Sequence, residues 1–274
     1  MSGCSLVVLK FGSSVLRNEA DLPRVADEIA GHVAAGRRVL AVVSAIGSGT
    51  DELAGRADTV ARGIERESPA AQAAYAALLG TGEAVSAALV GLALDRRGLD
   101  FTILDVGRVG PFTRGPQLDA QPHALDTSGI KRTLAERPVA ILPGFVGRDA
   151  YGRHTLLGRG GSDLTALFVA HTLRAEHCRL LKDVDGIYEH DPALSSLAKA
   201  RRFAALDWDG ALRLQDAILQ HKAAQYAFRH RVVFEVGACG GKAGTLVGAA
   251  ESRFAPPSPA ARCRTIAAEG RLAS

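Results

Sequence analysis

Side chains suited to anion chemistry are concentrated in one stretch of the chain, residues 158–192. It opens with the hexapeptide GRGGSD at 158–163, which is followed over 164–174 by an apolar run that predicts a buried helix. Gly160 and Gly161 would let the backbone come close to a ligand. Because a helix N-terminus attracts negative charge, this pattern indicates an anion site.

Three further side chains of the same hexapeptide fit this interpretation. Arg159 carries a planar guanidinium that suits a carboxylate or a phosphate. Ser162 or Asp163 could cap the first free amides of the helix. An ordinary capped helix explains these residues without any ligand, so both interpretations stay open on this stretch alone.

Two loops nearer the N-terminus could contribute to the same site. Lys10 ends an apolar run and is followed by the small residues of Gly12-Ser13-Ser14, whose amides could face a ligand. Ser44 follows a second apolar run, and Glu83 follows a glycine. Without further information, Lys10 is explained equally by a solvated charge, and Glu83 by a first-turn glutamate that complements a helix dipole.

Strand and helix patterns alternate along nearly the whole chain, which predicts a mostly parallel sheet covered on both faces, with ligands at the strand ends. Glycine and aspartate turns separate these segments, and Thr50 or Asp51 is expected to cap a helix. Strands are expected at 6–11, 39–43, 101–106, 139–142, 179–184, 232–236 and 244–247, with a hairpin over 145–157. Helices are expected at 21–36, 70–79, 83–97, 122–136, 164–174, 208–214 and 217–229.

The composition favours a globular protein of one large domain or two joined lobes. The chain has 274 residues, is 47% hydrophobic and carries a formal charge of +4 that is not gathered into a basic block, so nucleic acid is not an expected partner. Four scattered cysteines indicate reduced thiols in a cytoplasm. Residues 6–9 are too short for a signal sequence, and no later run is expected to approach membrane-spanning length.

Motifs of several other enzyme classes are absent from the sequence. It contains no GxSxG elbow, HExxH helix, CxxC pair, Walker A loop or GxGxxG loop. Acyl-enzyme and zinc chemistry therefore have little support, and no metal-ligating residues are expected.

The segments GRGGSDLTA and LLKDVDGIYEHDP strongly resemble the amino-acid kinase family, and within it the catalytic domain of aspartate kinases. The resemblance covers about residues 6–248. It implies a three-layer α/β/α sandwich that transfers the γ-phosphoryl group of ATP to the side-chain carboxylate of L-aspartate. It also implies Mg²⁺ held mainly by the nucleotide phosphates, with small molecules as the substrates.

The resemblance assigns roles to residues at matching positions. Lys10 would stabilise the transferring phosphoryl group, Asp163 would orient Lys10, Arg159 would hold the substrate carboxylate and Glu83 its amino group. Further substrate contacts would come from Ser44, Thr50, Gly160, Gly161 and Ser162. The nucleotide would be bound by Lys10, Gly12, Ser13, Ser14, Lys182, Asp183, Asp185, Gly186, Tyr188 and Asp191.

One departure from the family concerns nucleotide charge. Aspartate kinases carry a late-helix lysine that reaches the nucleotide, and Ala217 stands at that position here. Lys182, which lies near the C-terminal end of a predicted strand, is our candidate to replace the missing charge, with Lys222 and Lys242 as weaker candidates. A solvated lysine at position 182 is the alternative.

Three smaller departures remain, and the last of them leaves the acceptor open. Thr81 and Ser13 replace a histidine and a glycine of the family motifs, and the loop over 107–122, expected to cover the site or line the acceptor pocket, resembles its equivalent poorly. The chain could thus phosphorylate another carboxylate, a carbamate or a phosphate. It could also be a catalytically impaired nucleotide-binding subunit.

The resemblance also divides the chain. We expect a catalytic domain over 1–248, with an acceptor lobe at 1–157 and a nucleotide lobe at 158–248, and a mobile tail over 249–274. That tail is too short for the regulatory ACT domains of aspartate kinases, so lysine and threonine are not expected to inhibit the isolated chain. A homo-oligomer or a separate regulatory partner is compatible with this organisation.

Overall fold

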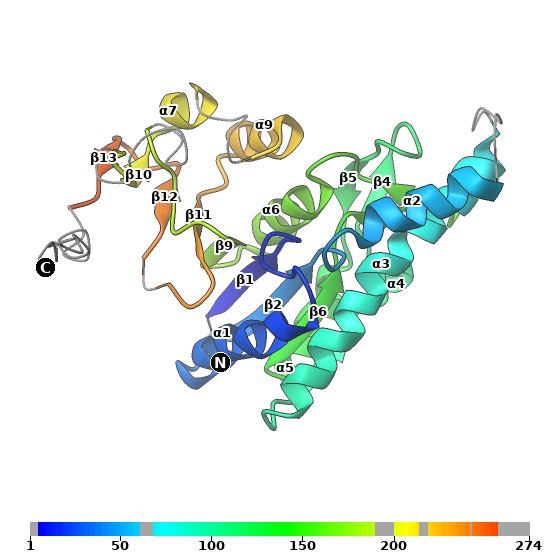
Figure 1. The fold of residues 1–274 in the computed structure, drawn as a ribbon, viewed down its shortest axis with the longest axis horizontal. Coiled ribbons are helices and arrows are strands. Elements are labelled where there is room, and N and C mark those ends of the chain that lie inside the picture. Colours follow the sequence, from blue (N-terminus) through cyan, green and yellow to red (C-terminus); the bar gives the residue numbers. More distant parts are fainter. Residues whose placement is uncertain (1–4, 61–67, 190–199, 214–218, 242, 257–274) are drawn as a thin grey trace, which may run out of the picture.

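The computed structural model describes residues 5–60, 68–189, 200–213, 219–241 and 243–256. Its centre is a nine-stranded sheet in the order β13-β10-β12-β11-β9-β1-β2-β6-β3 (Figure 1). The strands are β1 (Leu6–Phe11), β2 (Arg38–Val43), β3 (Phe101–Ile103), β6 (Val139–Pro143), β9 (His177–Lys182), β10 (Phe203–Leu206), β11 (Phe234–Ala238), β12 (Thr245–Val247) and β13 (Arg253–Phe254).

The centre of this sheet is parallel, as predicted. Strand β1 pairs in parallel with β2 and β9, and β2 in turn pairs in parallel with β6. Antiparallel pairing occurs between β11 and β12 and between β10 and β13. The central strands are nearly continuous apolar runs because helices cover both of their faces.

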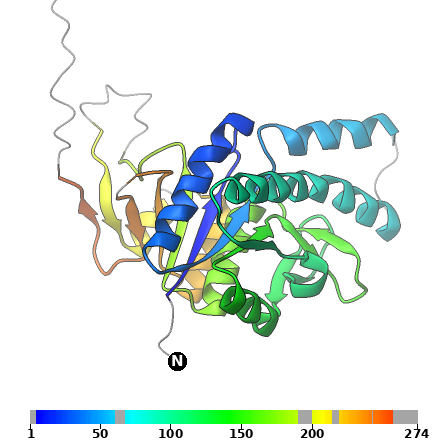
Figure 2. The same ribbon diagram turned by 90° about the horizontal axis from the view of Figure 1, so that it is seen from below.

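The two faces of the sheet bury alternate residues of each strand. Val7 and Leu9 of β1 pack with helices α1 (Leu22–Ala34) and α3 (Pro69–Asp95). Val8 packs on the other face with α5 (Thr127–Glu136), α6 (Gly161–Leu173) and α9 (His221–His230). Figure 2 shows α1 running along its face of the sheet. The expected three-layer α/β/α sandwich is confirmed.

Helix α3 is continuous, so the prediction of two helices separated at 80–82 was wrong. A side chain at Gly80 would place its Cβ 2.7 Å from Val146, and one at Gly82 would place it 2.9 Å from Ala45. These glycines permit close packing and do not end the helix. The 27-residue helix, with a mean hydropathy of 1.7 over 18 residues, also corrects the expectation that no run reaches membrane-spanning length. Core helices of globular proteins reach the same values, and α3 packs against α1, α2 and β6.

A second sheet, which the sequence did not predict, has the order β5-β4-β7-β8. The β7–β8 pair is the expected hairpin. The predicted strand over 101–106 ends at Ile103 because Asp105 caps α4, and the predicted helix over 122–136 starts only at Thr127 because β5 precedes it. The elements are α4 (Val106–Val109), β4 (Phe112–Arg114), β5 (Gln121–Ala124), β7 (Val146–Arg148) and β8 (His154–Leu156).

Several predicted helix starts need correction. Helix α2 (Gly49–Val60) begins before Thr50 and Asp51, so neither residue is its cap. Helix α6 is capped by Gly160 in a left-handed conformation, with φ of 70°, and Asp163 lies inside its first turn. Helix α9 begins at His221, after an extended Gln220. The start predicted at position 217 falls outside the described residues. Helix α7 (Trp208–Arg213) and a short 3-10 turn, η1 (Glu19–Asp21), are the remaining helical elements of the described residues.

The segment after Gly248 is part of the fold as far as residue 256, which corrects the predicted tail. Strand β13 pairs with β10, and the Phe254 ring stacks on Phe203 with centroids 4.4 Å apart. The Arg201 guanidinium lies 3.8 Å from the centroid of the Phe254 ring. Residues 257–274 lie outside the described part of the chain.

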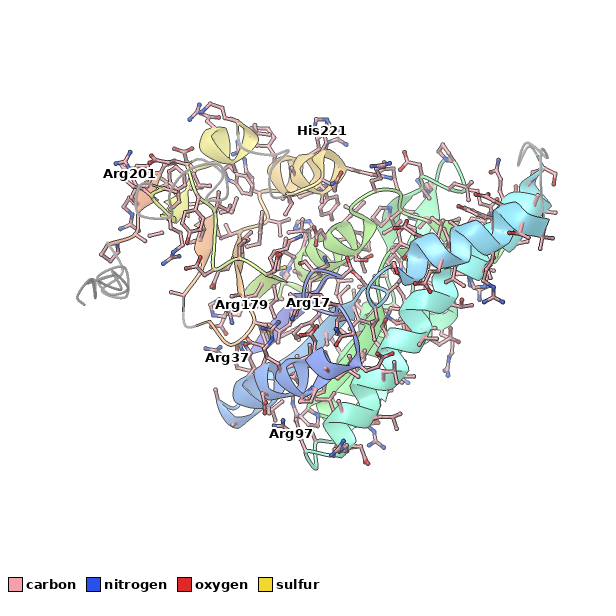
Figure 3. The ribbon with its side chains drawn as sticks, viewed as in Figure 1. Arg17, Arg37, Arg97, Arg179, Arg201 and His221 are labelled. Carbon is pink, nitrogen blue, oxygen red and sulfur yellow. The ribbon has the colours of Figure 1, made fainter. Side chains whose placement is uncertain are left out.

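Arg179 on β9 joins the layers of the sandwich (Figure 3). Its guanidinium pairs with Glu28 of α1 at 2.7 Å and with Glu235 of β11 at 3.2 Å. The two cysteines in the described residues, Cys178 and Cys239, are free and buried, as expected for reduced thiols.

Candidate active site

Three charged side chains meet where β1, β9 and α6 come together. Lys10 Nζ lies 2.6 Å from Asp163 Oδ1, and Lys182 Nζ lies 2.9 Å from Asp163 Oδ2. The pairing of β1 with β9 explains the arrangement, because Lys10 lies opposite Leu180. Lys182 is two residues after Leu180, so its side chain lies on the same face of the sheet as that of Lys10. That face carries α6, whose first turn supplies Asp163. We call Lys10, Asp163 and Lys182 the charge cluster.

Lys10 and Asp163 are buried, Lys182 is partly buried, and the charge cluster carries one excess positive charge. Burial alone would raise the pKa of Asp163, but the ammonium groups of Lys10 and Lys182 outweigh it and hold the pKa at about 2. Burial lowers the pKa of Lys10, and the charge of Lys182 adds to that effect, while Asp163 opposes both. A buried excess of positive charge favours binding of an anion.

The loop after β1 lies against this cluster. A Cβ at Gly12 would come within 2.6 Å of Lys10 Nζ, so a larger residue at this position would displace the Lys10 ammonium group. Ser13 is exposed and Ser14 half-buried in the same turn, which the Gly12 carbonyl closes by accepting from Val15 and Leu16.

A cavity of about 500 Å³ opens beside Lys10 and Asp163 at the carboxyl ends of the strands. Leu118 lines it, so the 107–122 segment contributes to the pocket as expected. The cavity brings together predicted site residues from distant segments: Lys10, Ser13, Ser44, Thr50, Glu83, Arg159, Gly160, Gly161, Ser162 and Asp163. It also has an apolar wall that sequence reasoning missed, formed by Tyr75, Leu79, Leu118, Phe145 and Leu156.

Glu83 is the most unusual carboxyl group of the cavity. Only 2% of the residue is exposed, Oε1 accepts from the Ala45 amide at 3.2 Å, and Oε2 has no hydrogen-bond partner among the described residues. Burial raises the pKa of Glu83 to about 7, against the opposing effect of the Ala45 amide. An unpartnered buried carboxylate is well suited to receive a ligand ammonium group.

Arg159 lies exposed at the rim of the cavity, in the loop between β8 and α6. Gly158 and Gly160 flank it with φ of 75° and 70°. A Cβ at Gly158 would come within 2.1 Å of Asp119, and one at Gly160 within 2.4 Å of Gln220, so side chains are excluded at both positions. The loop therefore holds Arg159 between two tightly packed glycines.

The remaining predicted nucleotide residues lie beyond the end of β9, outside the lining of this cavity. Asp183 is exposed, and Asp185 accepts from the Tyr188 hydroxyl at 2.7 Å and pairs with Arg202 at 3.5 Å. Burial, followed by Asp185, raises the pKa of Tyr188 to about 12. Gly186 is buried beside them, whereas Asp191, Ala217 and Lys242 lie outside the described residues.

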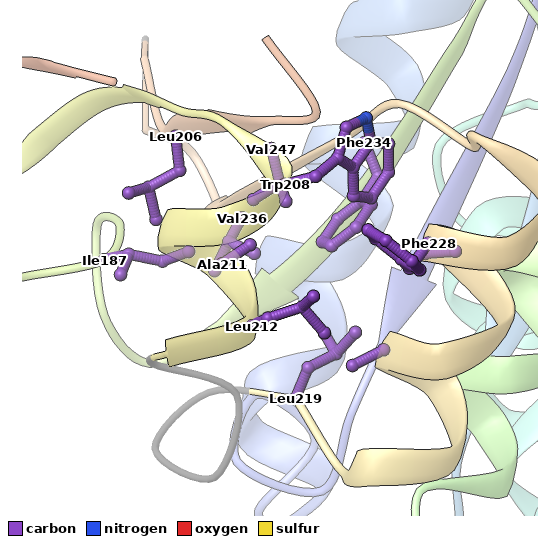
Figure 4. Close-up of a pocket in the computed structure, with 12 residues that line it drawn as sticks. Ile187, Leu206, Trp208, Ala211, Leu212, Leu219, Phe228, Phe234, Val236 and Val247 are labelled. Carbon is purple, nitrogen blue, oxygen red and sulfur yellow. The ribbon is translucent and has the colours of Figure 1, made fainter. Parts of the chain in front are cut away.

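A second, smaller cavity of about 30 Å³ lies between α7 and α9 (Figure 4). Trp208, Phe228 and Phe234 line it together with aliphatic side chains, and no charged residue of the described part of the chain lines it. It is part of the apolar core around β11 and β12, so it does not contribute to the charged site.

The fold and the site define a class: three-layer α/β proteins with a cationic ligand crevice at the carboxyl edge of a mostly parallel sheet. The amino acid kinase family model matches residues 5–230, and the chain belongs to this family.

Among similar proteins is the aspartokinase of Geobacillus stearothermophilus, 32% identical over 234 residues that cover 84% of this chain and 56% of the relative. A solved aspartate kinase from Synechocystis has a TM-score of 0.74 at 30% identity, over 93% of this chain and 41% of that one. An isopentenyl phosphate kinase shares the fold, with a TM-score of 0.63 at 20% identity over 88% of this chain and 99% of the other. The chain thus spans about half the length of the curated relatives it matches.

Proposed function

We propose that this chain is an ATP-dependent kinase that phosphorylates the side-chain carboxylate of L-aspartate. The observation that carries the proposal is the buried charge cluster beside a cavity that also contains Glu83 and Arg159. The similarity to aspartokinases supports aspartate as the acceptor. In this reaction a carboxylate oxygen bonds to the γ-phosphorus, the bond to the β-phosphate oxygen breaks, and ADP leaves.

The phosphoryl step needs positive charge and positioning more than covalent help from the protein. Lys10 and Lys182 would stabilise charge on the transferring group, and Asp163 would hold both ammonium groups in place. The amides of Gly12, Ser13 and Ser14 would bind phosphate oxygens. Magnesium would enter with the nucleotide and neutralise phosphate charge. Asp183, Asp185, Gly186, Tyr188 and Asp191 are proposed for the nucleotide lobe, residues 158–248.

Recognition of the acceptor would use the other side of the cavity, mainly from residues 1–157. Glu83 would take the amino group, because it offers an unpartnered carboxylate oxygen. Arg159 would take a carboxylate through its two-pronged guanidinium. The hydroxyls of Ser44 and Thr50, together with the Gly160–Ser162 turn, would complete the pocket.

A second candidate is the same reaction type on a different acceptor. The apolar wall favours it, because Tyr75, Leu118 and Phe145 offer more apolar surface than the single methylene of aspartate can cover. Another carboxylate, a carbamate or a phosphate ester with a larger carbon skeleton would use this wall.

One assay decides between these candidates. The purified protein is incubated with Mg-ATP, aspartate and hydroxylamine, which traps an acyl phosphate as a coloured hydroxamate. Colour that depends on both ATP and aspartate supports the proposal. ADP release with another acceptor but not with aspartate supports the second candidate. Nucleotide binding without any turnover would refute the kinase proposal and indicate a nucleotide-binding subunit.

We also propose a cellular location and an oligomeric state for this kinase. A cytoplasmic location agrees with the free, buried Cys178 and Cys239. A homo-oligomer or a separate regulatory partner belongs to the same proposal, and light scattering of the purified protein checks the first of these.

The raised pKa of Glu83 predicts a pH dependence of acceptor use. Because the carboxyl group ionises near pH 7, kcat/KM for aspartate should rise about tenfold between pH 6 and pH 8 as the carboxylate becomes available to the amino group. The variant Glu83→Gln should lose this inflection and bind aspartate weakly. A flat profile in the parent protein would remove Glu83 from acceptor binding.

The same pKa shift predicts an effect on stability. A carboxyl group with a folded-state pKa above its unfolded value disfavours the folded state once pH exceeds both values. Glu83→Gln should therefore raise the free energy of unfolding at pH 8, on the order of 3 kcal/mol, with much less gain at pH 4. Urea unfolding at the two pH values measures it, and an equal change at both would contradict the assignment.

Lys182 is proposed to supply the charge that the lysine missing at position 217 would give. Lys182→Thr leaves a neutral Lys10–Asp163 pair, so turnover or ATP affinity should fall about tenfold or more. Lys182→Arg, which keeps the charge, should lose less, and adding Ala217→Lys to Lys182→Thr should partly restore the loss. If Lys182→Thr matches the parent in ATP titration and turnover, Lys182 is a solvated strand-end lysine.

A further inference from the structure

Lys222 lies near the start of a helix with most of its side chain buried, which is unusual for a lysine. It is the second residue of α9, where the helix dipole disfavours a positive charge, yet only 18% of its side chain is exposed. The side chain extends away from α9 to a different part of the chain. It was a weaker candidate for the missing nucleotide charge, and its contacts indicate another role.

The ammonium group of Lys222 is saturated by oxygens from two segments of the acceptor side. Nζ lies 2.6 Å from Asp119 Oδ1, 2.9 Å from the Ala120 carbonyl and 2.8 Å from the Leu157 carbonyl, with the Asp119 carbonyl at 3.2 Å. An ammonium group has three protons, so the three short contacts use its full capacity. No donor is left over for a nucleotide phosphate.

Both segments that Lys222 holds form walls of the acceptor cavity. The Asp119–Ala120 turn follows Leu118, which lines the cavity, and Leu157 precedes the loop that carries Arg159. The segments are joined to each other by the bond from the Ala120 amide to the Leu156 carbonyl at 2.8 Å. Lys222 is thus positioned to fix Leu118 and Arg159 relative to each other.

The contact also joins α9 to the acceptor lobe. Helix α9 packs on α6, in the part of the chain proposed to bind the nucleotide. The neighbouring Gln220 lies so close to Gly160 that a Cβ there would come within 2.4 Å of it. The Asp119 side chain is 65% exposed, so the ion pair itself contributes little, and the carbonyl contacts define the geometry.

We infer that Lys222 is a positioning residue that holds two walls of the acceptor cavity in place from α9. This inference rests on the proposed kinase function. Only the fixing of the two backbone segments by Lys222 is independent of it, and hydrogen exchange tests that part without an activity assay. Among the described residues, the hydrogen bonds of Lys222 go to Asp119, Ala120 and Leu157, none of which belongs to the charge cluster or lines the cavity, so its effect would pass through the backbone of residues 118–120 and 157–159.

The test compares Lys222→Met with a matched control, Lys131→Met, whose parent lysine is exposed on α5. Methionine keeps most of the side-chain length and loses the three donors. Lys222→Met should raise the KM for aspartate about tenfold or more, because small misplacements of substrate-binding groups are costly. The dissociation constant for Mg-ATP should stay within about twofold of the parent value, and Lys131→Met should change neither quantity.

Hydrogen exchange supplies a measurement that does not depend on activity. The amides of Ala120 and Leu156, which bond to the Leu156 and Gln117 carbonyls, should exchange faster in Lys222→Met than in the control. Unchanged exchange overturns the inference whatever the enzyme does. Faster exchange with an unchanged KM also overturns it, as does an equal loss of acceptor and nucleotide affinity. If the parent protein does not use aspartate and Lys222→Met still exchanges faster, the aspartate proposal is refuted but the structural contact is supported. The KM comparison is then made with the acceptor that the parent protein does use.

Discussion

Lys10→Ala should lower turnover by about two to three orders of magnitude while changing nucleotide affinity far less. The reason is that Lys10 lies in the buried charge cluster, where a cation is most valuable when negative charge accumulates in the transition state. Asp163 would keep Lys182 as its partner in this variant, so the protein should still fold. Single-turnover hydroxamate formation and ATP titration separate the two quantities.

The matched control for this variant is Lys131→Ala, which removes an exposed lysine from α5. It should leave turnover unchanged. Near-normal turnover in Lys10→Ala would mean that the cluster is a structural ion pair and that phosphoryl transfer takes place elsewhere.

The second large effect is expected from Asp163→Asn, and here stability should suffer as much as activity. The variant leaves the buried ammonium group of Lys10 and the partly buried one of Lys182 facing a neutral amide. Removing one partner of a buried ion pair costs about 3–5 kcal/mol. Urea unfolding at pH 7 measures this loss, and the exposed Asp95→Asn, at the end of α3, serves as the control.

The pH dependence of the Asp163→Asn variant follows from the lysines. Burial already lowers the pKa of Lys10, and loss of Asp163 removes the group that opposes this shift. A lysine with a folded-state pKa below its unfolded value destabilises the protein while it is charged, and this penalty disappears as pH rises through the two values. The variant should therefore regain stability relative to the parent between pH 7 and pH 10. A constant difference over this range would contradict the account.

The sequence predicted the parts of the fold that depend on local patterns. Apolar runs such as those at 6–11 and 139–142 are strands, and their burial on both faces implied the parallel sheet. The meeting of Lys10 with Asp163 could be expected only through the family resemblance, since 153 positions separate them in the sequence. Once the register of β1 and β9 is known, the strand alternation explains why Lys182 joins them.

The errors arose where distant partners override local signals. Gly80 and Gly82 have the pattern of helix breakers, yet they lie inside α3 because Val146 and Ala45 pack against them. The second sheet was missed because its strands are short and β5 contains Pro122. The role of Lys222 was equally hidden, because its partners lie between 65 and 103 positions away.

Lys10 and Lys182 lie on neighbouring strands, and this placement affects how the proposed activity could evolve. Their separation is set by the strand spacing of about 4.8 Å and a two-residue stagger of about 6.6 Å, both properties of the backbone ladder. The other walls of the cavity, in contrast, come from loops, from helices α2 and α3, and from β8 of the small second sheet. In the proposed kinase, substitutions in these walls would exchange one acceptor for another while the charge cluster keeps its geometry. Under the proposed function, acceptor preference would be a separable trait, open to drift or to directed evolution without changes to the charge cluster.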